Sequence, residues 1–517
     1  MAEKFFWADE IAEQIIKKNP NKKQYVCASG ITPSGVVHIG NFREIITTEL
    51  VVRALKDKGK KTKFIYSWDD FDRFRKVPVG IPKEYEKYIG MPVSDFSSPF
   101  DKKKSYAKYF EEQFETSLKK VGIKPNFIRQ NEMNKKCKYS NLIKSAIEKR
   151  KEIIKILNKY RKEPLSKDWW PVVVYCEKCK KDFTRILDIK EYIIEYECGC
   201  GFKNKIDFSK KGIVKAPWRV DWPMRWKYEG VDFEPGGIDH SVHGGSLTTG
   251  KEIVKDIFNG EAPTYVFYDW VKLKGGEEFA SSTGNALSIN EVLEVYEPEL
   301  LRYLFVSQKP RTGFQISFDN DVIKIYEDYD NLEERYFSNR VNPREKRIYE
   351  MCQLRLNKKA PEKKSSSALG QTKEFAKTSS SMRGQTKESF RHLTTLVQVG
   401  KVDAKHNKRA EKVKNWLNKY AGEDMKFEVQ TKVLVKLNVK EKKALLKLKD
   451  ILKAKKHSEE ELFNMFYEIC KDTGITNTDF FSAAYRVIIN KPKGPRLASL
   501  ILNVGEGKII KLLEQIK

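Results

Sequence analysis

The spacing of hydrophobic residues in the first part of the chain alternates between two periods. The segments "KQYVCASGI" and "KTKFIYSWDD" are short β-branched runs that end in glycine and in acids, so each predicts a buried strand. Between them, "HIGNFREIITTELVVRALKDKG" has apolar residues at helical spacing and ends in glycine, which predicts a helix. Strand, helix and strand in this order predict a βαβ unit, and such units build parallel sheets.

Beyond this unit the pattern changes three times. From about Pro92 to Gly212 it is irregular, rich in lysine and marked by cysteines, as expected of an insertion. "APWRVDWPMRW", "GIDHSVHGGS", "APTYVFYDWVKL" and "SSTGNALSINEVLEVY" then predict short strands with glycine-rich turns. From about Pro298 the chain is rich in leucine, lysine and glutamate at helical spacing, which predicts an all-α unit. We therefore expect a split α/β domain at 1–92 and 213–297, an insertion at 93–212 and a helical region at 298–517.

One segment of the helical region is repeated. "SSSALGQTKEFAKT" at 365–378 is followed directly by "SSSMRGQTKESFRH" at 379–392. Two copies are too few for a solenoid, which needs about three stacked units, and the serines favour a flexible connection. We expect a surface insertion that arose by local duplication, with a Ser-rich loop at 363–390.

Composition and charge indicate the kind of partner. The 517 residues are 40% hydrophobic and 12% aromatic, so the chain should fold, into about three domains. Its formal net charge of +28 favours nucleic acid as partner, with solubility alone as the alternative. No apolar run is long enough to span a bilayer, and "MAEKFFWADEIAEQIIKKN" predicts an amphipathic helix rather than a signal peptide. We expect a cytoplasmic protein that does not contact a membrane.

The eight cysteines divide into two groups. Four stand alone, whereas Cys176, Cys179, Cys198 and Cys200 form Cys-x2-Cys and Cys-x-Cys pairs with eighteen residues between them. This is not a disulfide framework, and it fits a reducing cytoplasm with one metal site. Four thiolates at this spacing can surround zinc tetrahedrally and close its coordination shell. We expect structural Zn²⁺ in the insertion, and four buried free cysteines are the alternative.

The turn in "CASGITPSGVVHIGN" has the features of an anion site. Gly30 and Gly35 allow the chain to pass close to a ligand, and Pro33 fixes one φ angle. The helix that opens at His38 directs its free N–H groups into this turn. An imidazole there can hydrogen-bond a phosphate oxygen, and Gly40 leaves room for a base or ribose. A structural histidine in an ordinary βα turn is the alternative, but the preceding "TPSG" favours a nucleotide.

These residues match two signatures of a known enzyme class. "PSGVVHIGN" resembles the HIGH signature of class I aminoacyl-tRNA synthetases, with Asn41 in place of its last histidine. "GGEEFASSTGNALS" at 275–288 resembles the KMSKS loop, which holds the ATP phosphates, in its Ser-Ser-x-Gly-Asn core. Glu278 and Thr283 stand where that loop has lysines, so hydroxyl and turn N–H groups, or a lysine just ahead of the loop, would bind the phosphates instead. A generic Ser/Gly loop is the alternative.

The chain resembles one family of that class, the archaeal-type class I lysyl-tRNA synthetases, in five phrases: "ITPSGVVHIGNFRE", "DRFRKVP", "WRVDWPMRW", "DHSVHGGS" and "KGPRL". The resemblance implies a Rossmann-like catalytic domain with an inserted zinc-knuckle subdomain, followed by an all-α domain that binds the tRNA anticodon. It also implies a monomer that uses ATP with Mg²⁺ to activate L-lysine as lysyl-adenylate and then transfers the lysyl group to tRNA(Lys).

Residue by residue, the resemblance assigns three groups of side chains. The amino-acid pocket would be lined by Gly30, Thr32, Trp218, His240 and Tyr268. ATP would contact Pro33, Ser34, Gly35, His38, Gly40, Asn41, Gly244, Gly245, Ser281, Ser282, Gly284 and Asn285. Catalysis would rest on His38, Gly40, Asn41, Ser281, Ser282 and Thr283.

The residue types themselves are compatible with a lysine pocket. Such a pocket needs a carboxylate or carbonyl for the ε-ammonium and aromatic walls for the aliphatic stem. Candidate walls are Trp218, Trp222, Trp226 and Tyr268, and candidate counter-charges are Asp69, Asp70, Asp72, Asp221 and Asp239. Core packing is the alternative for each tryptophan, and a turn or helix cap for each aspartate. The two histidines of "DHSVHGGS" leave a metal site as an alternative to an adenylate-binding loop.

Other functions stay open at this point. Basic helices such as "KVDAKHNKRAEKVKNWLNKY" would line a phosphate track, or would simply be solvated surfaces. A glutamyl relative would want an arginine in the pocket turn, and a cysteinyl relative would want zinc in the pocket. A non-catalytic RNA-binding paralogue would keep the fold and the zinc knuckle, and the missing loop lysines favour it.

Overall fold

The computed structural model describes residues 6–275, 286–354, 388–402, 404 and 407–516. The chain forms two compact units. Unit 1 holds Met1–Leu293, Pro298–Ile316 and Arg335–Lys358, and unit 2 holds Glu294–Glu297, Ser317–Glu334 and Lys359–Lys517. Most of the repeated Ser-rich segment lies outside the described residues, so its expected character stays a prediction.

The centre of unit 1 is a five-stranded parallel sheet in the order β10-β9-β1-β2-β3. The strands are β1 (Tyr25–Ile31), β2 (Thr62–Trp68), β3 (Asn126–Arg129), β9 (Phe233–Gly237) and β10 (Thr264–Tyr268). Numbered along the chain, this is the 3-2-1-4-5 order of a Rossmann-like sheet. The order reverses between β1 and β9, and ligands of such sheets bind at the carboxyl ends of the strands beside that reversal.

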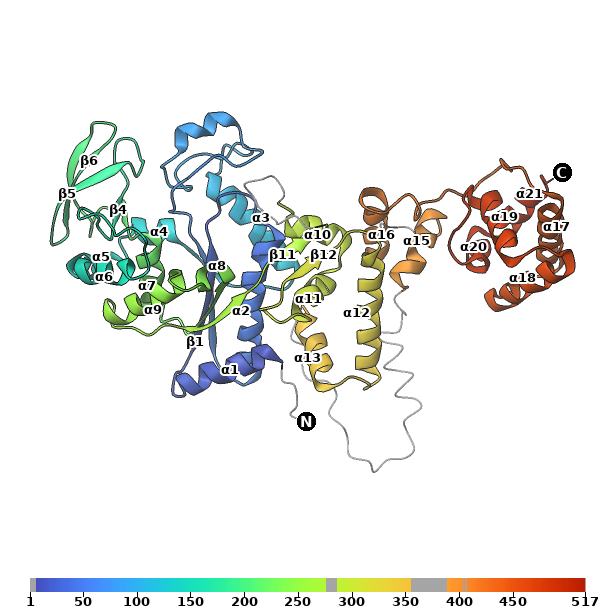
Figure 1. Ribbon diagram of the computed structural model, residues 1–517, viewed down its shortest axis with the longest axis horizontal. Coiled ribbons are helices and arrows are strands. Elements are labelled where there is room, and N and C mark those ends of the chain that lie inside the picture. Colours follow the sequence, from blue (N-terminus) through green and yellow to red (C-terminus); the bar gives the residue numbers. More distant parts are fainter. Residues whose placement is uncertain (1–5, 276–285, 355–387, 403, 405–406, 517) are drawn as a thin grey trace, which may run out of the picture. The chain divides into compact units, whose positions relative to one another are not determined.

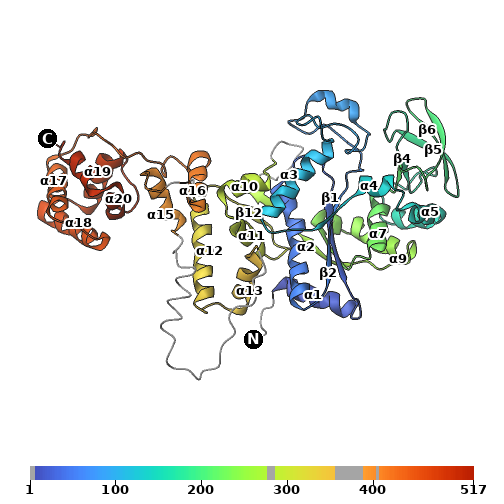
Figure 2. The same cartoon turned by 180° about the vertical axis from the view of Figure 1, so that it is seen from behind.

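Helices cover both faces of this sheet (Figures 1 and 2). The helices α1 (Trp7–Lys18) and α2 (Ile39–Asp57) lie on one face. On the other face, α7 (Trp218–Glu229) and α9 (Ser246–Asp256) place Trp222, Trp226 and Val254 in one apolar cluster with β1 and β2. Because both faces of the sheet are covered, its strands are near-continuous apolar runs, as the sequence of β1 indicates.

The chain between β2 and β9 adds several elements to the sheet. It contains the 3₁₀ helix η1 (Lys83–Tyr88) and the helices α3 (Tyr106–Lys120), α4 (Gln130–Lys135), α5 (Ser140–Glu148) and α6 (Arg150–Asn158). An antiparallel sheet then follows, in the order β5-β6-β7 (Thr184–Lys190, Ile193–Cys198, Lys203–Asp207). The strands that flank this sheet in the sequence, β4 (Val173–Val174) and β8 (Val214–Lys215), pair with each other. The edge strand β3 of the main sheet lies within 93–212, and the predicted domain boundaries stay predictions.

Three of the segments predicted as short strands form helices, and one of them, "GIDHSVHGGS", forms α8 (Ile238–Ser241) and the start of α9. "WRVDWPMRW" forms α7, although its apolar residues alternate and Pro223 lies inside it. The prediction of a strand was wrong here. It took the alternation of apolar and polar residues to mean one buried and one exposed face, but the polar residues Asp221 and Arg225 are buried and form an ion pair. "SINEVLEVY" forms α10 (Ile289–Val295).

Among the described residues after 298, the secondary structure is helical except for one short strand. In unit 1, α11 (Pro298–Val306) and α13 (Pro343–Cys352) accompany a parallel pair of short strands, β11 (Val271–Leu273) and β12 (Phe314–Ile316), and β12 was not predicted. The helix α12 (Asp321–Phe337) begins in unit 2 and ends in unit 1. Unit 2 also holds α15 (Phe390–Gln398), α16 (Lys408–Lys419), α17 (Val439–Ala454), α18 (Glu459–Thr473), α19 (Asn477–Ile489), α20 (Leu497–Val504) and α21 (Glu506–Leu513).

The five helices α17–α21 share one apolar core, which includes Leu448, Phe466, Phe480 and Leu500. This bears out the helical pattern of the C-terminal sequence. Within the described parts of the chain, no helix has the length and apolar character needed to cross a bilayer.

Candidate active site

The turn between β1 and α2 lies at the carboxyl end of a central strand, beside the reversal of strand order. His38 is the N-cap of α2, and Asn41 Oδ1 accepts a hydrogen bond of 3.2 Å from its backbone N–H. Pro33 and Gly35 are buried under this turn, whereas Ser34 is exposed. The N-terminus of α2, the positive end of the helix dipole, therefore lies at this turn and suits an anion.

The His38 imidazole is neutral at physiological pH. Burial lowers its pKa to about 4, because the charged imidazolium loses more hydration energy than the neutral ring. A neutral imidazole can hydrogen-bond a phosphate oxygen or a leaving group without adding a full charge. His38 therefore fits the positioning role that the sequence predicts for it, although no described contact tests that role.

The two signature segments meet at the start of α2. Ile39 N–H donates a 2.7 Å hydrogen bond to the Leu287 carbonyl, and His38 forms an antiparallel bridge with Ser288. Residues 286–288, the last three of the second signature, are thereby held against the first turn of the helix. The predicted site residues Ser281, Ser282, Thr283, Gly284 and Asn285 lie outside the described residues.

A carboxylate that the sequence analysis missed joins two predicted pocket residues. The Gly30 N–H donates to Glu44 Oε1 and the Tyr268 hydroxyl donates to Glu44 Oε2, both at 2.8 Å. Burial raises the pKa of Glu44 to about 8, and the negative charges of Glu234 and Asp69 contribute to the rise. A cationic ligand group beside Glu44 would lower that pKa, because it would stabilise the ionised carboxylate.

One sequence signal could have pointed to Glu44. It lies on α2 six residues after His38, and every other position from Phe42 to Leu55 is buried, whereas Glu44 itself is partly buried. An acid within such a run of buried positions needs a partner or a ligand. Glu44 lies outside both signatures, at the end of the phrase "ITPSGVVHIGNFRE".

The five aspartates predicted as counter-charges have different surroundings. Asp69 accepts from Arg225 at 2.6 Å, Asp221 pairs with Arg225 at 3.2 Å, and Asp72 pairs with Lys215. These three therefore have cationic partners within the protein. Asp70 accepts a 2.7 Å hydrogen bond from the Asn131 N–H, and Asp239 is exposed.

Thr32, another predicted pocket residue, is oriented by this charge network. Its hydroxyl donates a 2.9 Å hydrogen bond to Asp72 Oδ2. Burial would raise the pKa of Asp72, but the adjacent Lys215 ammonium and its hydrogen bond lower the pKa below its usual value. Asp72 is thus an ionised acceptor that fixes the Thr32 side chain at the end of β1.

The aromatic residues form one wall of the site. The rings of Trp218 and Trp222 stack at 5.2 Å between centroids, and the His240 ring lies 5.9 Å from each of them. Trp222 and Trp226 are 4% and 1% exposed, so they are core residues, as the alternative for each tryptophan proposed. Trp218, His240 and Tyr268 are only partly buried and can contact a ligand.

The glycines of "DHSVHGGS" have backbone requirements of their own. Gly244 has φ +73°, and a Cβ on Gly245 would lie 2.6 Å from the His240 carbonyl oxygen. They form the N-terminus of α9 after the short helix α8 (Ile238–Ser241). The histidines of this loop belong to no cluster of three metal-binding side chains among the described residues.

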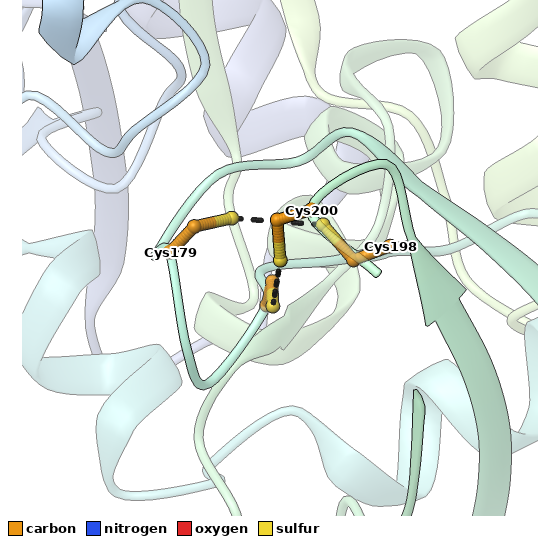
Figure 3. Close-up of side chains that lie close together, drawn as sticks. Cys179, Cys198 and Cys200 are labelled. Atoms are coloured by element: carbon orange, nitrogen blue, oxygen red, sulfur yellow. Dashed lines mark hydrogen bonds between the residues drawn. The ribbon is translucent and has the colours of Figure 1, made fainter. Parts of the chain in front are cut away.

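The four clustered cysteines do form such a group (Figure 3). Their Sγ atoms all lie within 4.8 Å of one another, with Cys179 and Cys198 at 3.6 Å and Cys176 and Cys200 at 3.8 Å. Zinc held tetrahedrally by Zn–S bonds of about 2.3 Å places its sulfurs about 3.8 Å apart. The predicted cluster is therefore confirmed as a geometry that can hold a metal ion.

Comparison with known proteins agrees with this geometry. Residues 5–355 match the family model described as tRNA synthetases class I (K). The chain belongs to this family. A lysine--tRNA ligase of Borreliella burgdorferi is 41% identical, with 98% of each chain covered. A lysine--tRNA ligase of Pyrococcus horikoshii is 37% identical, with 98% of this chain and 99% of that protein covered. The class I synthetase fold that the two signatures predicted is thus confirmed.

Proposed function

We propose that the protein is a lysine--tRNA ligase, which activates lysine with ATP and then charges tRNA(Lys). One observation carries the choice of lysine within the class I family: the buried carboxylate of Glu44 stands between Gly30 and Tyr268. A buried acid with a raised pKa needs a cation to ionise at low cost, and the lysine ε-ammonium supplies that charge. Relatives that cover the whole chain support the same reaction.

The lysine side chain would lie between aromatic surfaces. The aliphatic stem would pack on Trp218 with His240 beside it, and the α-amino and carboxylate groups would face Thr32 at the end of β1. Burial raises the pKa of Glu44 to about 8 and that of Glu234 to about 7, so both groups favour the neutral form unless a cation is bound. Neither group would supply a positive charge to a glutamate carboxylate, which would therefore be disfavoured.

Activation would proceed by in-line attack of the lysine carboxylate on the α-phosphorus of ATP, with release of pyrophosphate. No protein nucleophile is needed, so the protein would contribute positioning and charge stabilisation. The phosphates would contact the N-terminus of α2, His38 and the segment 281–285, and the adenosine would lie over Pro33–Asn41 and Gly244–Gly245. Bound Mg²⁺ would neutralise phosphate charge.

The second step would transfer the lysyl group to a terminal ribose hydroxyl of tRNA(Lys). The helices of unit 2 would contact the anticodon arm, and the cysteine cluster would hold structural Zn²⁺ that stabilises β5-β6-β7. We further propose that the protein is a cytoplasmic monomer, since its substrates are the components of translation.

ATP–pyrophosphate exchange on the purified protein, with each amino acid in turn and with and without tRNA, tests the proposal. We expect exchange that depends on lysine in at least one of the two conditions. Exchange with another amino acid would refute the specificity. No exchange in either condition, together with intact tRNA binding, would instead support a non-catalytic RNA-binding paralogue.

A further inference from the structure

Trp270 stands exposed beside the candidate lysine pocket. It is 49% exposed, and every other tryptophan among the described residues is buried or partly buried. It lies two residues after Tyr268, in the short link between β10 and β11. Two residues of extended chain reach about 7 Å, so the exposed indole stands at the rim of the pocket.

A second segment places positive charge next to this indole. The Asp269 N–H donates to the Pro310 carbonyl at 3.0 Å, and the Phe314 N–H donates to the Trp270 carbonyl at 3.3 Å. The loop 309–313 therefore runs alongside Trp270. It presents two exposed cationic residues, Lys309 and Arg311.

Neither cation is paired with a carboxylate in the described part of the chain. No ion pair among those residues includes the Lys309 ammonium or the Arg311 guanidinium. The Arg311 guanidinium instead lies 4.8 Å from the centroid of the Phe267 ring. An aromatic neighbour orients a guanidinium and leaves its charge available to an anion.

A buried arginine holds this loop in one conformation. Arg43 is 3% exposed, and its Nη2 donates to the carbonyls of Lys309, Pro310 and Thr312 at 3.0, 2.7 and 2.7 Å. Arg43 belongs to the second turn of α2, the helix that carries His38. Lys309 and Arg311 are thus displayed by a rigid loop that is fixed to the helix of the nucleotide site.

We propose that Trp270, Lys309 and Arg311 bind the unpaired 3′ strand of the RNA substrate, with one base stacked on the indole and its phosphates on the two cations. Exposed aromatic rings beside unpaired cations are the means by which proteins hold single-stranded nucleic acid. The proposal rests on the proposed function, because transfer requires the terminal ribose to reach the pocket. A strand that enters the pocket must pass its rim, where Trp270 stands.

Direct RNA binding tests the contact separately from catalysis. The dissociation constant is measured for the full-length wild-type protein and for Trp270→Ala, with tRNA(Lys) and with the same RNA lacking its unpaired 3′ nucleotides. We expect Trp270→Ala to weaken binding of the intact RNA by about 5- to 100-fold, the range for loss of one stacked base. Its effect on the shortened RNA should be below about twofold, and Trp270→Phe should retain most of the affinity because it keeps an aromatic face.

The salt dependence of RNA binding tests the two cations separately. The double variant Lys309→Ala with Arg311→Ala should reduce the slope of log Kd against log salt by about 1 to 2 for the intact RNA, as expected for two lost phosphate contacts. Tyr228→Ala is the matched control, since Tyr228 is an aromatic residue of unit 1 with 40% exposure. Tyr228 lies ten residues along α7 from Trp218, or about 15 Å, and its loss should leave both dissociation constants unchanged.

Three outcomes decide the proposal. Loss of affinity confined to the intact RNA supports it. An equal loss of affinity for both RNAs would place the contact elsewhere on the RNA and overturn the 3′-strand assignment. Unchanged affinity for both RNAs would overturn it as well. Failure of the wild-type protein to bind tRNA(Lys) would instead refute the proposed function itself, and it is visible before any variant is made.

Discussion

The lysine assignment rests on Glu44, which would be ionised when the lysine ε-ammonium is bound, so Glu44→Gln is the sharpest test of it. The substitution keeps the shape of the side chain and removes its charge. The glutamine Oε1 can still accept from the Gly30 N–H, and its Nε2 can donate to the Tyr268 hydroxyl, which can rotate to accept. The fold should therefore survive, and the change should act on the bound ammonium.

The size of the effect follows from the burial of the pair. Removing one partner of a buried ion pair costs about 3–5 kcal/mol, because the other charge is left without compensation. At about 1.4 kcal/mol per factor of ten, kcat/KM for lysine should fall by roughly 10²- to 10³-fold or more. The KM for ATP should change little, since Glu44 lies at the amino-acid end of the site.

The pH dependence gives an independent readout of the same group. Because the pKa of Glu44 is raised to about 8, the free protein gains the ionised form as pH rises through 8. Since kcat/KM reports ionisations of the free enzyme, kcat/KM for lysine should rise between pH 6.5 and 8.5. In Glu44→Gln this rise should be absent. A variant that keeps kcat/KM within about fivefold of wild type and the same pH profile would refute the role of Glu44.

Three further substitutions test other parts of the site. His38→Ala should lower the rate of adenylate formation by about 10²-fold, as for loss of one preorganised hydrogen bond to the transition state, with lysine affinity by calorimetry nearly unchanged; equal rates would exclude the role. Cys179→Ser should reduce bound zinc, measured by atomic absorption, and lower the Tm, whereas an unchanged metal content would exclude the cluster as the site. Gly30→Ala should raise the KM for lysine and cost about 1–3 kcal/mol of stability in a urea melt, because the new Cβ would lie 2.6 Å from the Ser67 carbonyl oxygen; wild-type values in both assays would contradict this.

The sequence predicted those parts of the fold that are determined by residues close together in the chain. The β1–α2–β2 unit followed from its spacing and its glycine turn, and the four-cysteine cluster followed from its two short pairs. In both cases the residues that determine the structure are close in sequence. Asn41 is another example, because its side chain accepts from the N-cap of its own helix.

The parts that were missed depend on contacts between distant segments. Glu44 becomes a candidate pocket residue only through the hydrogen bond from Tyr268, which lies more than 200 residues later in the sequence. The helix α7 was taken for a strand because Asp221 and Arg225 look exposed until Asp69 is brought against them. The strand β12 is three residues long, which is too short for periodicity to detect.

The pairing of β4 with β8 has a consequence for how the chain reaches this structure. Completion of the main sheet requires Cys27 of β1 to find Phe233 of β9, roughly 200 residues away, and such non-local pairing slows folding. Pairing of Val173 with Lys215 closes the cysteine-bearing segment into a loop of its own and shortens the effective separation between β3 and β9. Metal binding by that segment early in folding would then increase the rate at which the main sheet forms. If the cluster holds zinc, as proposed, refolding in the presence of a chelator should be slower than refolding with zinc.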